Sequence, residues 1–362
     1  RLENELGTKC VNKYPPGVGI FQSPFFAIFK SIKSQSVFTK LDHFMVLTIG
    51  ASLLFISCFL IHKINLSSGI SKEISLISLL AFLFGGGLFH HGTYEASFSH
   101  IYSVFGYTIG LFLVKRIKDK RINRIYYPLI FIVSIWLNLV RITNVLLTFS
   151  IFVIGVMNVK EPNINIYFNK KQLKLLTTFI FSTFISFIFS FIYTYLMLGN
   201  FTINTYGEES NSIFADFGKH FYDVLFSFDG GLFPYYPVFL LTLFLFIISR
   251  KTLVGYLFFG LVILYAIIYG SWESWYLGGG FGHRGFIDVI PLGVISLAES
   301  IDNFNKYKRR IIFFIVGVCI YINTSMMIDY WAGEFPFDAE KKYFIRSVIK
   351  FNWLSSLMNK LF

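Results

Sequence analysis

The chain has 362 residues, of which 55% are hydrophobic and only 14% are charged, against about 25% in an ordinary soluble domain. So few charges cannot cover so much apolar surface in water, and the composition therefore excludes an ordinary soluble fold. The net charge of +12 does not indicate a partner nucleic acid, because the basic residues fall in short clusters between apolar runs, as in membrane proteins.

Uncharged apolar runs of spanning or near-spanning length follow one another along the chain. They cover 44–61, 74–89, 96–114, 125–140, 142–157, 175–198, 232–249, 252–272, 289–298 and 311–328. Several are shorter than the roughly 20 residues of a straight span, and short or broken helices at membrane depth usually line a cavity. The sequence therefore predicts an all-α, polytopic transmembrane bundle over 1–330, with about 10–11 membrane segments and extracytoplasmic loops.

The connecting segments sort into two groups by charge. The basic group, which holds 16 Lys and Arg residues, comprises 115–124, 158–174, 250–251 and 302–310. The other group, which holds two, comprises 90–100, 198–231 and 270–287. The positive-inside rule places the basic group in the cytoplasm. We therefore expect a multi-pass protein of the cytoplasmic (inner) membrane whose active face is extracytoplasmic.

Two regions depart from this scheme. If the segments before residue 17 and at 90–100 both lie outside, three apolar segments between them break the parity, so we expect 17–29 to be re-entrant or interfacial. The tail 331–362 has apolar residues at helical spacing but is interrupted by Lys and Arg. An in-plane amphipathic helix fits this tail better than a further membrane crossing.

The first polar constellation is the segment His90–His100, in which Glu95 accompanies three histidines, His90, His91 and His100. Imidazoles and a carboxylate can act as acid, base or metal ligands. An ionisable cluster at membrane depth favours a functional site over the alternative, a polar helix cap at the water interface. Glu95 and His100 are thus candidate contributors to catalysis.

The second constellation runs from Trp272 to Asp288 and surrounds a glycine run with aromatic and charged residues. Backbone N–H groups in such a run can hold an anion, and Arg284 can clamp a phosphate with two hydrogen bonds. Glu273 is a third candidate contributor to catalysis. The alternative is an interfacial aromatic belt in which Arg284 pairs with Asp288.

Three further segments carry weaker signals. Arg141, in the segment Arg141–Asn144 between two short apolar runs, needs an anionic partner, either a carboxylate or a phosphate. Gly and Pro residues in 226–237 indicate a shaped turn into the next span. The segment 12–26, with Lys13 and Tyr14, reads as a loop that enters a helix at prolines.

These five segments, in this order, resemble polyprenyl-phosphate-sugar-dependent glycosyltransferases of the GT-C fold, in the branch of the protein O-mannosyltransferases and aminoarabinose transferases. The resemblance covers about residues 12–300. The matching segments are Tyr14 to Phe26, Glu95 to His100, Arg141 to Asn144, Gly231 to Pro237 and Trp275 to Pro291.

The resemblance implies transfer of a hexosyl or pentosyl group from a polyprenyl-phosphate donor to a protein, lipid or glycan acceptor in the cell envelope. No cofactor is expected, although the histidine cluster keeps a divalent metal open. The expected substrate-binding residues are Arg284, Arg141, His283, Tyr14, Lys13, Trp275, Asp288 and Asn144.

One family feature has no match. Family members carry an essential acidic residue, usually Asp, in the outer loop after their first transmembrane helix, and residues 1–16 contain no Asp. Either that helix and its acid lie upstream of residue 1, or the chain is catalytically altered, and we therefore assign no catalytic base.

Two other classes stay open. A transporter or lipid flippase would suit the broken helices near Arg141, but its ionisable groups should lie near the midplane and an inverted repeat should be visible. A non-catalytic membrane scaffold would suit the unmatched acid.

Overall fold

The structure, a computed structural model, describes residues 14–32, 39–118, 125–157, 170–199, 201, 216–249, 251–336 and 340–361. Within these ranges the regular structure is entirely helical, which confirms the predicted all-α class. In chain order the elements are α1 (Gly17–Ile32), α2 (Lys40–Ser67), α3 (Lys72–Gly85), α4 (Leu88–Thr93), α5 (His100–Lys118), α6 (Tyr126–Val140), the 3₁₀ turn η1 (Ile142–Asn144), α7 (Val145–Val156), α8 (Lys170–Leu198), α9 (Phe221–Phe226), α10 (Leu232–Tyr235), α11 (Pro237–Ile248), α12 (Leu253–Gly270), the 3₁₀ turn η3 (Arg284–Val289), α13 (Ile290–Asp302), α14 (Lys306–Ala332), α15 (Lys341–Phe344), the π-helical turn η4 (Ile345–Ile349) and α16 (Asn352–Leu361).

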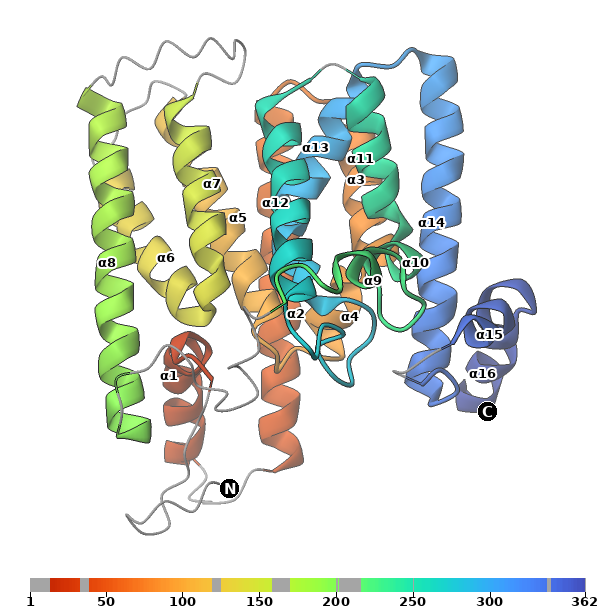
Figure 1. Ribbon diagram of the computed structural model, residues 1–362, viewed down its shortest axis with the longest axis horizontal. Helices are drawn as coiled ribbons and strands as arrows, with labels where there is room; N and C mark the ends of the chain where they lie inside the picture. The colour runs from red at the N-terminus through yellow and green to blue at the C-terminus, as the bar shows by residue number, and fades with distance from the viewer. Residues whose placement is uncertain are drawn as a thin grey trace.

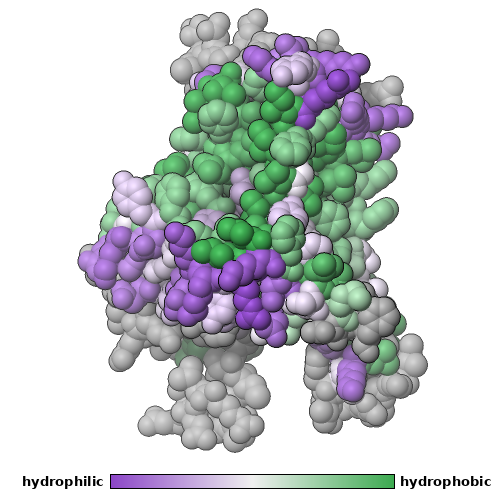
Figure 2. Space-filling view, turned by 90° about the vertical axis from the view of Figure 1, so that its right-hand side faces the viewer, coloured by the Kyte–Doolittle hydropathy of each residue, from purple (hydrophilic) through white to green (hydrophobic). Residues whose placement is uncertain are grey.

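Four of the described helices are long and apolar enough to cross a membrane: α2, α8, α12 and α14. At 1.5 Å per residue, the 18 residues of α12 reach about 27 Å and the 28 residues of α2 about 42 Å. Shorter apolar helices accompany them, at Gly17–Ile28, Tyr126–Val140, Ile142–Val156 and Pro237–Ile248. Figure 2 shows the matching surface, an apolar belt between two hydrophilic zones, on the side of the molecule where α14 runs.

The two ends of the bundle differ in the way that the loop charges predict. Helices α7, α11 and α13 finish at the upper end of Figure 1, where α8, α12 and α14 begin. Lys170, Lys251 and Lys306 mark that end. The short elements α4, α9 and α10 lie toward the opposite end. Among the described residues these three lysines share one end of the bundle, as the loop charges predict, and which end faces the cytoplasm stays a prediction.

The parity problem before residue 90 disappears because α1 does not run the length of the bundle. It lies at the lower end of Figure 1, beside the end of α6. Gly17 is at the contact, since a Cβ there would come 2.4 Å from the backbone nitrogen of Val140, and its carbonyl accepts from the Trp136 indole at 2.9 Å. Helices α2 and α3 then carry the chain across and back, as the interfacial interpretation of 17–29 requires.

The apolar core around α13 determines where η3 lies. Nearly every residue of α13 is buried, among α3, α11 and α12. The rings of Phe82, Phe239 and Phe258 pack against one another with centroids 5.2 to 6.3 Å apart. Burial of this apolar surface fixes α13 along the bundle, and η3, which precedes it, is held at the lower end of the core.

The tail is divided into short elements. Helix α14 continues to Ala332, and the described tail is broken at Phe351, which has a left-handed φ of 54°. That the tail lies in the plane of the membrane stays a prediction. The buried carboxylate of Asp329 holds the tail on α14, accepting from Ser347 at 2.5 Å and from Ser356 at 2.7 Å. The tail is therefore docked on the bundle, with α16 as a separate helix.

Candidate functional site

Two glycines place the histidines inside the protein. Helix α3 ends at Gly85, and Gly87 has a φ of 76° that a side chain rarely adopts. A Cβ on Gly87 would lie 2.4 Å from the ring of Tyr236, so the backbone can approach that ring only with glycine here. Helix α4 therefore starts afresh at a new angle, and its His90 and His91 point into the core with no exposed surface.

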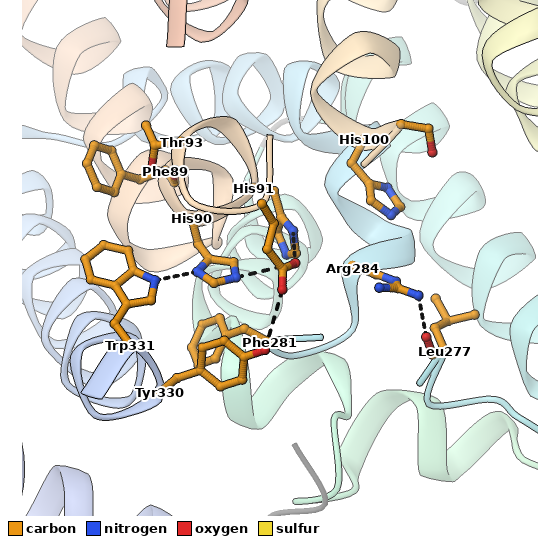
Figure 3. Close-up of polar contacts among 12 residues, drawn as sticks. Phe89, His90, His91, Thr93, His100, Leu277, Phe281, Arg284, Tyr330 and Trp331 are labelled. Atoms are coloured by element: carbon orange, nitrogen blue, oxygen red, sulfur yellow. Dashed lines mark hydrogen bonds and ion pairs between the residues drawn. The ribbon is translucent and has the colours of Figure 1, made fainter. Parts of the chain in front are cut away.

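Glu95 joins these two imidazoles from the turn that follows α4. Its Oε2 lies 3.4 Å from His90 Nε2 and 3.2 Å from His91 Nδ1, and its side chain is only 10% exposed. Tyr330, near the end of α14, donates to the other carboxylate oxygen at 3.5 Å. Figure 3 shows the two imidazoles between Trp331 on one side and Arg284 on the other. We call His90, His91 and Glu95 the Glu95 cluster.

Aromatic side chains from distant elements hold the outer edges of both imidazoles. The Trp331 indole donates to His90 Nδ1 at 2.8 Å. On the other ring, His91 Nε2 lies 3.2 Å from the Tyr236 hydroxyl, which donates to the carbonyl of Phe281 at 2.6 Å. The rings are thus fixed in orientation by Tyr236 after α10, by α14, and by the segment 271–283 between α12 and η3, which we call the glycine loop.

Burial and mutual contact set the charge of this cluster. Burial lowers the pKa of His91 to about 4, although its contact with Glu95 opposes the shift. Burial would raise the pKa of Glu95, but its contacts with His90 and His91 outweigh burial and hold it below the ordinary range. At neutral pH the cluster therefore contains a carboxylate beside a neutral His91.

A second cluster of buried ionisable groups forms at the break between α6 and η1. Asp288, fully buried in η3, accepts from His100 Nδ1 at 2.9 Å and lies 3.5 Å from Arg141 Nε. Arg141 also reaches the Tyr269 hydroxyl at 3.2 Å. Burial raises the pKa of Asp288 to about 7, an effect that Arg141 counters. We call Arg141, His100 and Asp288 the Arg141 triad.

This triad corrects the alternative interpretation of Asp288. Among the described contacts Asp288 pairs with Arg141 and His100 rather than with Arg284, because η3 directs its carboxylate toward α5 and the α6–η1 break. Arg141 thus has a carboxylate partner inside the protein, with its side chain 21% exposed, and whether it also binds a ligand stays a prediction.

Arg284 lies beside the Glu95 cluster on the side of His100 (Figure 3). It donates to the carbonyl of Leu277 at 2.5 Å, and its guanidinium lies 4.6 Å from the centre of the Phe98 ring. Its positive charge also contributes to the low pKa of His91.

His283 and Trp275 close the glycine loop on itself. His283, with no exposed surface, donates from Nε2 to the carbonyl of Trp275 at 3.0 Å. Burial lowers the pKa of His283 to about 3. The loop is therefore fastened at its two ends, and Arg284 follows directly from this fixed point.

The remaining predicted residues lie apart from both clusters. Glu273 is 67% exposed and pairs with Lys219 at 3.4 Å. Asn144 is buried and donates to Ser103 and to the carbonyl of Leu137, so it supports the helix break. Tyr14 is largely exposed, and Lys13 lies outside the described residues.

Sequence reasoning missed Tyr236, Tyr269, Tyr330 and Trp331. The Tyr-Tyr pair before Pro237 is visible in the sequence as a polar-tipped aromatic pair at a helix start, and could have been singled out. Trp331 gives no such signal, because its partner His90 lies 241 residues away.

One atom from each of His90, His91 and Glu95 lies within 4.8 Å of the others, a spacing that could hold a metal ion. The Trp331 contact bears on this option. A metal-binding imidazole usually donates its second N–H outward, whereas His90 Nδ1 accepts. The donor set therefore fits a metal poorly at His90.

The fold and this site define a class: an all-helical protein with helices able to span a membrane and a buried ionisable site toward one end of its bundle. No protein-family model, no curated protein and no solved structure matches the chain.

Proposed function

We propose that the chain is an integral membrane glycosyltransferase that moves a sugar from a polyprenyl-phosphate donor to an acceptor hydroxyl. The observation that carries the proposal is the position of Glu95, a buried carboxylate between two imidazoles with the guanidinium of Arg284 beside the cluster. A base for the acceptor and a cation for the leaving group are the two parts that this reaction needs.

In the proposed reaction Glu95 takes the proton of the acceptor hydroxyl, and the oxygen attacks the anomeric carbon of the sugar. The bond from that carbon to the phosphate oxygen breaks, and its electron pair leaves with the phosphate. A single displacement of this kind inverts the anomeric carbon. Arg284 stabilises the charge that the phosphate gains, whereas Arg141 serves the helix break because Asp288 already neutralises it.

An apolar groove beside the cluster supports a lipid-linked donor. It measures about 290 Å³ and lies where α14 and the docked tail meet the end of α3 and the start of α4. Its walls include Phe84, Phe89, Met327, Trp331 and Leu357. Because Trp331 also contacts His90, a prenyl chain in this groove would bring its phosphate to the Glu95 cluster. The acceptor can be a protein, a lipid or a glycan, on the extracytoplasmic face of the inner membrane.

The test uses the purified chain in vesicles that contain a polyprenyl-phosphate sugar with a radiolabelled sugar, offered mixed acceptors. Release of the sugar from the lipid is measured. Glu95→Gln should slow release by about 10²–10⁴-fold, the usual contribution of a general base. Arg284→Ala should abolish it. Glu340→Gln and Arg310→Ala change the same residue types at exposed positions and should keep the rate. Unchanged release by Glu95→Gln would refute the assignment.

A transporter is the second candidate, because the Arg141 triad lies at a helix break inside the bundle, as ion sites of transporters do. The same vesicles separate the two. Accumulation of the intact lipid-linked sugar in the opposite leaflet, with no release, would favour transport.

A further inference from the structure

The hydrogen positions in the Glu95 cluster follow from groups that can only donate. An indole nitrogen has a hydrogen and no lone pair to offer, so the 2.8 Å contact requires Trp331 to donate to His90 Nδ1. Nδ1 of His90 therefore has a lone pair. A neutral His90 then carries its hydrogen on Nε2, the atom 3.4 Å from Glu95 Oε2.

The same reasoning fixes the outer nitrogen of His91. The Tyr236 hydroxyl has one hydrogen, and the carbonyl of Phe281 at 2.6 Å can only accept it. Towards His91 the hydroxyl oxygen must therefore accept, so the hydrogen in the 3.2 Å contact belongs to His91 Nε2. A neutral His91 then has its lone pair on Nδ1.

One series of hydrogen bonds runs from Trp331 through His90, and the other runs through Tyr236 and His91. The two series meet at Glu95, where one hydrogen is missing. His91 Nδ1 and Glu95 Oε2 are 3.2 Å apart, both are buried, and neither makes a hydrogen bond among the described residues. With a neutral imidazole and a carboxylate, two lone pairs face each other there. Such a contact is repulsive until a proton lies between the two atoms.

We propose that His91 and Glu95 act together as the base and hold the transferred proton between His91 Nδ1 and Glu95 Oε2. This inference rests on the proposed function for the origin of the proton. The acceptor O–H bond breaks, the proton enters the gap, and the electron pair stays on the acceptor oxygen. His91 is then a catalytic residue, whereas Trp331 and Tyr236 are positioning residues that fix which nitrogen of each ring is bare.

Other ionisable groups face this gap and shape its proton affinity. The imidazole of His100 lies 5.8 Å from that of His91, measured between ring centres. From the elements packed around the pair come the charged or titratable groups of His90, Tyr330, Tyr235, Tyr236, His283 and Arg284. Arg284 and the histidines oppose a second positive charge, so the gap takes up one proton and not two.

The experiment measures the imidazole ¹⁵N chemical shifts of the full chain in detergent micelles between pH 3 and pH 9, with each histidine assigned by substitution. In the wild type we expect a bare Nδ1 and a protonated Nε2 on His90, and a protonated Nε2 on His91. Nδ1 of His91 should gain its proton on acidification. Glu95→Gln should lower the proton affinity of His91 Nδ1 at least tenfold.

Trp331→Phe removes the donor to His90 Nδ1 and should give His90 a mixture of both neutral forms. Trp136→Phe is the matched control, because it removes an indole donor that bonds a backbone carbonyl far from the cluster. It should leave both histidines unchanged.

A protonated Nδ1 on His90 in the wild type would overturn the proposal. So would Zn²⁺ that shifts His90 Nε2 and His91 Nδ1 together, since the three groups would then be metal ligands. These spectra need no donor substrate, so their outcome is independent of the sugar-release assay. Loss of release in Glu95→Gln together with a protonated His90 Nδ1 would overturn the shared proton and leave the transferase proposal standing.

Discussion

Replacement of His283 by Gln should make the protein less sensitive to acid. Gln keeps a neutral N–H donor that can reach the carbonyl of Trp275 but cannot take up a proton. In the folded protein burial lowers the pKa of His283 from 6.5 to about 3. In the unfolded chain the imidazole titrates near its ordinary value, so below that pH the unfolded chain binds a proton that the folded protein excludes.

The sign and size follow from this difference. Because the folded pKa is the lower one, the stability that His283 contributes is complete above about pH 6.5 and is lost as the pH falls toward about 3. With these two values, acidification from pH 7.5 to pH 5 costs the wild type about 2 kcal/mol at this residue. The corresponding loss at pH 4 is about 3 kcal/mol.

The assay is unfolding by SDS in mixed micelles at pH 7.5 and pH 5. The free energy of unfolding of the wild type should fall by about 2 kcal/mol more than that of His283→Gln. Other acid-sensitive groups, His91 among them, are common to both proteins and cancel. His43→Gln changes an exposed histidine and should follow the wild type. Equal losses in the wild type and His283→Gln would refute the reasoning that burial keeps this ring neutral.

Three further changes probe the supports of the site. Asp288→Asn leaves the charge of Arg141 without its carboxylate and should destabilise the protein by about 3–5 kcal/mol in SDS unfolding. The double variant with Arg141→Met should recover much of this stability, and no recovery would contradict the pairing. Gly282→Ala should lower the free energy of unfolding by about 1–3 kcal/mol, because φ is 62° and the new Cβ would lie 2.7 Å from the buried hydroxyl of Tyr236. Gly278→Ala, where the new Cβ meets open space, should lower it less, and equal losses would contradict this reasoning. Asp329→Ala should release the tail to limited proteolysis, and unchanged digestion would show that other contacts hold it.

The arrangement of the helices was largely predictable from the sequence, because it depends on apolar length and on the distribution of charge. Each of the ten apolar runs falls within, or mostly within, described helices. The loop charges separated the two ends of the bundle for the same reason. The break of the tail at Phe351 could not be predicted, because helical spacing does not reveal that a bulky residue takes a left-handed conformation.

The sequence predicted which residues form the site, but not which side chains pair with one another. The sequence placed His90, His91 and Glu95 in one segment, yet on a regular helix residues five apart share a face poorly. The turn after α4 brings Glu95 back to both imidazoles. His100 goes elsewhere, to Asp288, which is 188 residues away in the sequence. Contacts between residues so far apart in the sequence depend on how α5 and α13 pack, and no local sequence pattern predicts them.

The contrast between the two clusters indicates which one is reactive. In the Arg141 triad neutral His100 can donate from Nδ1 to Asp288 and accept from Arg141 on Nε2, at 2.9 and 3.1 Å. Loss of any member of this triad would leave another buried group without its partner. In the Glu95 cluster the two lone pairs at 3.2 Å remain until a proton arrives. The triad therefore suits the support of the α6–η1 break, and the Glu95 cluster suits proton transfer.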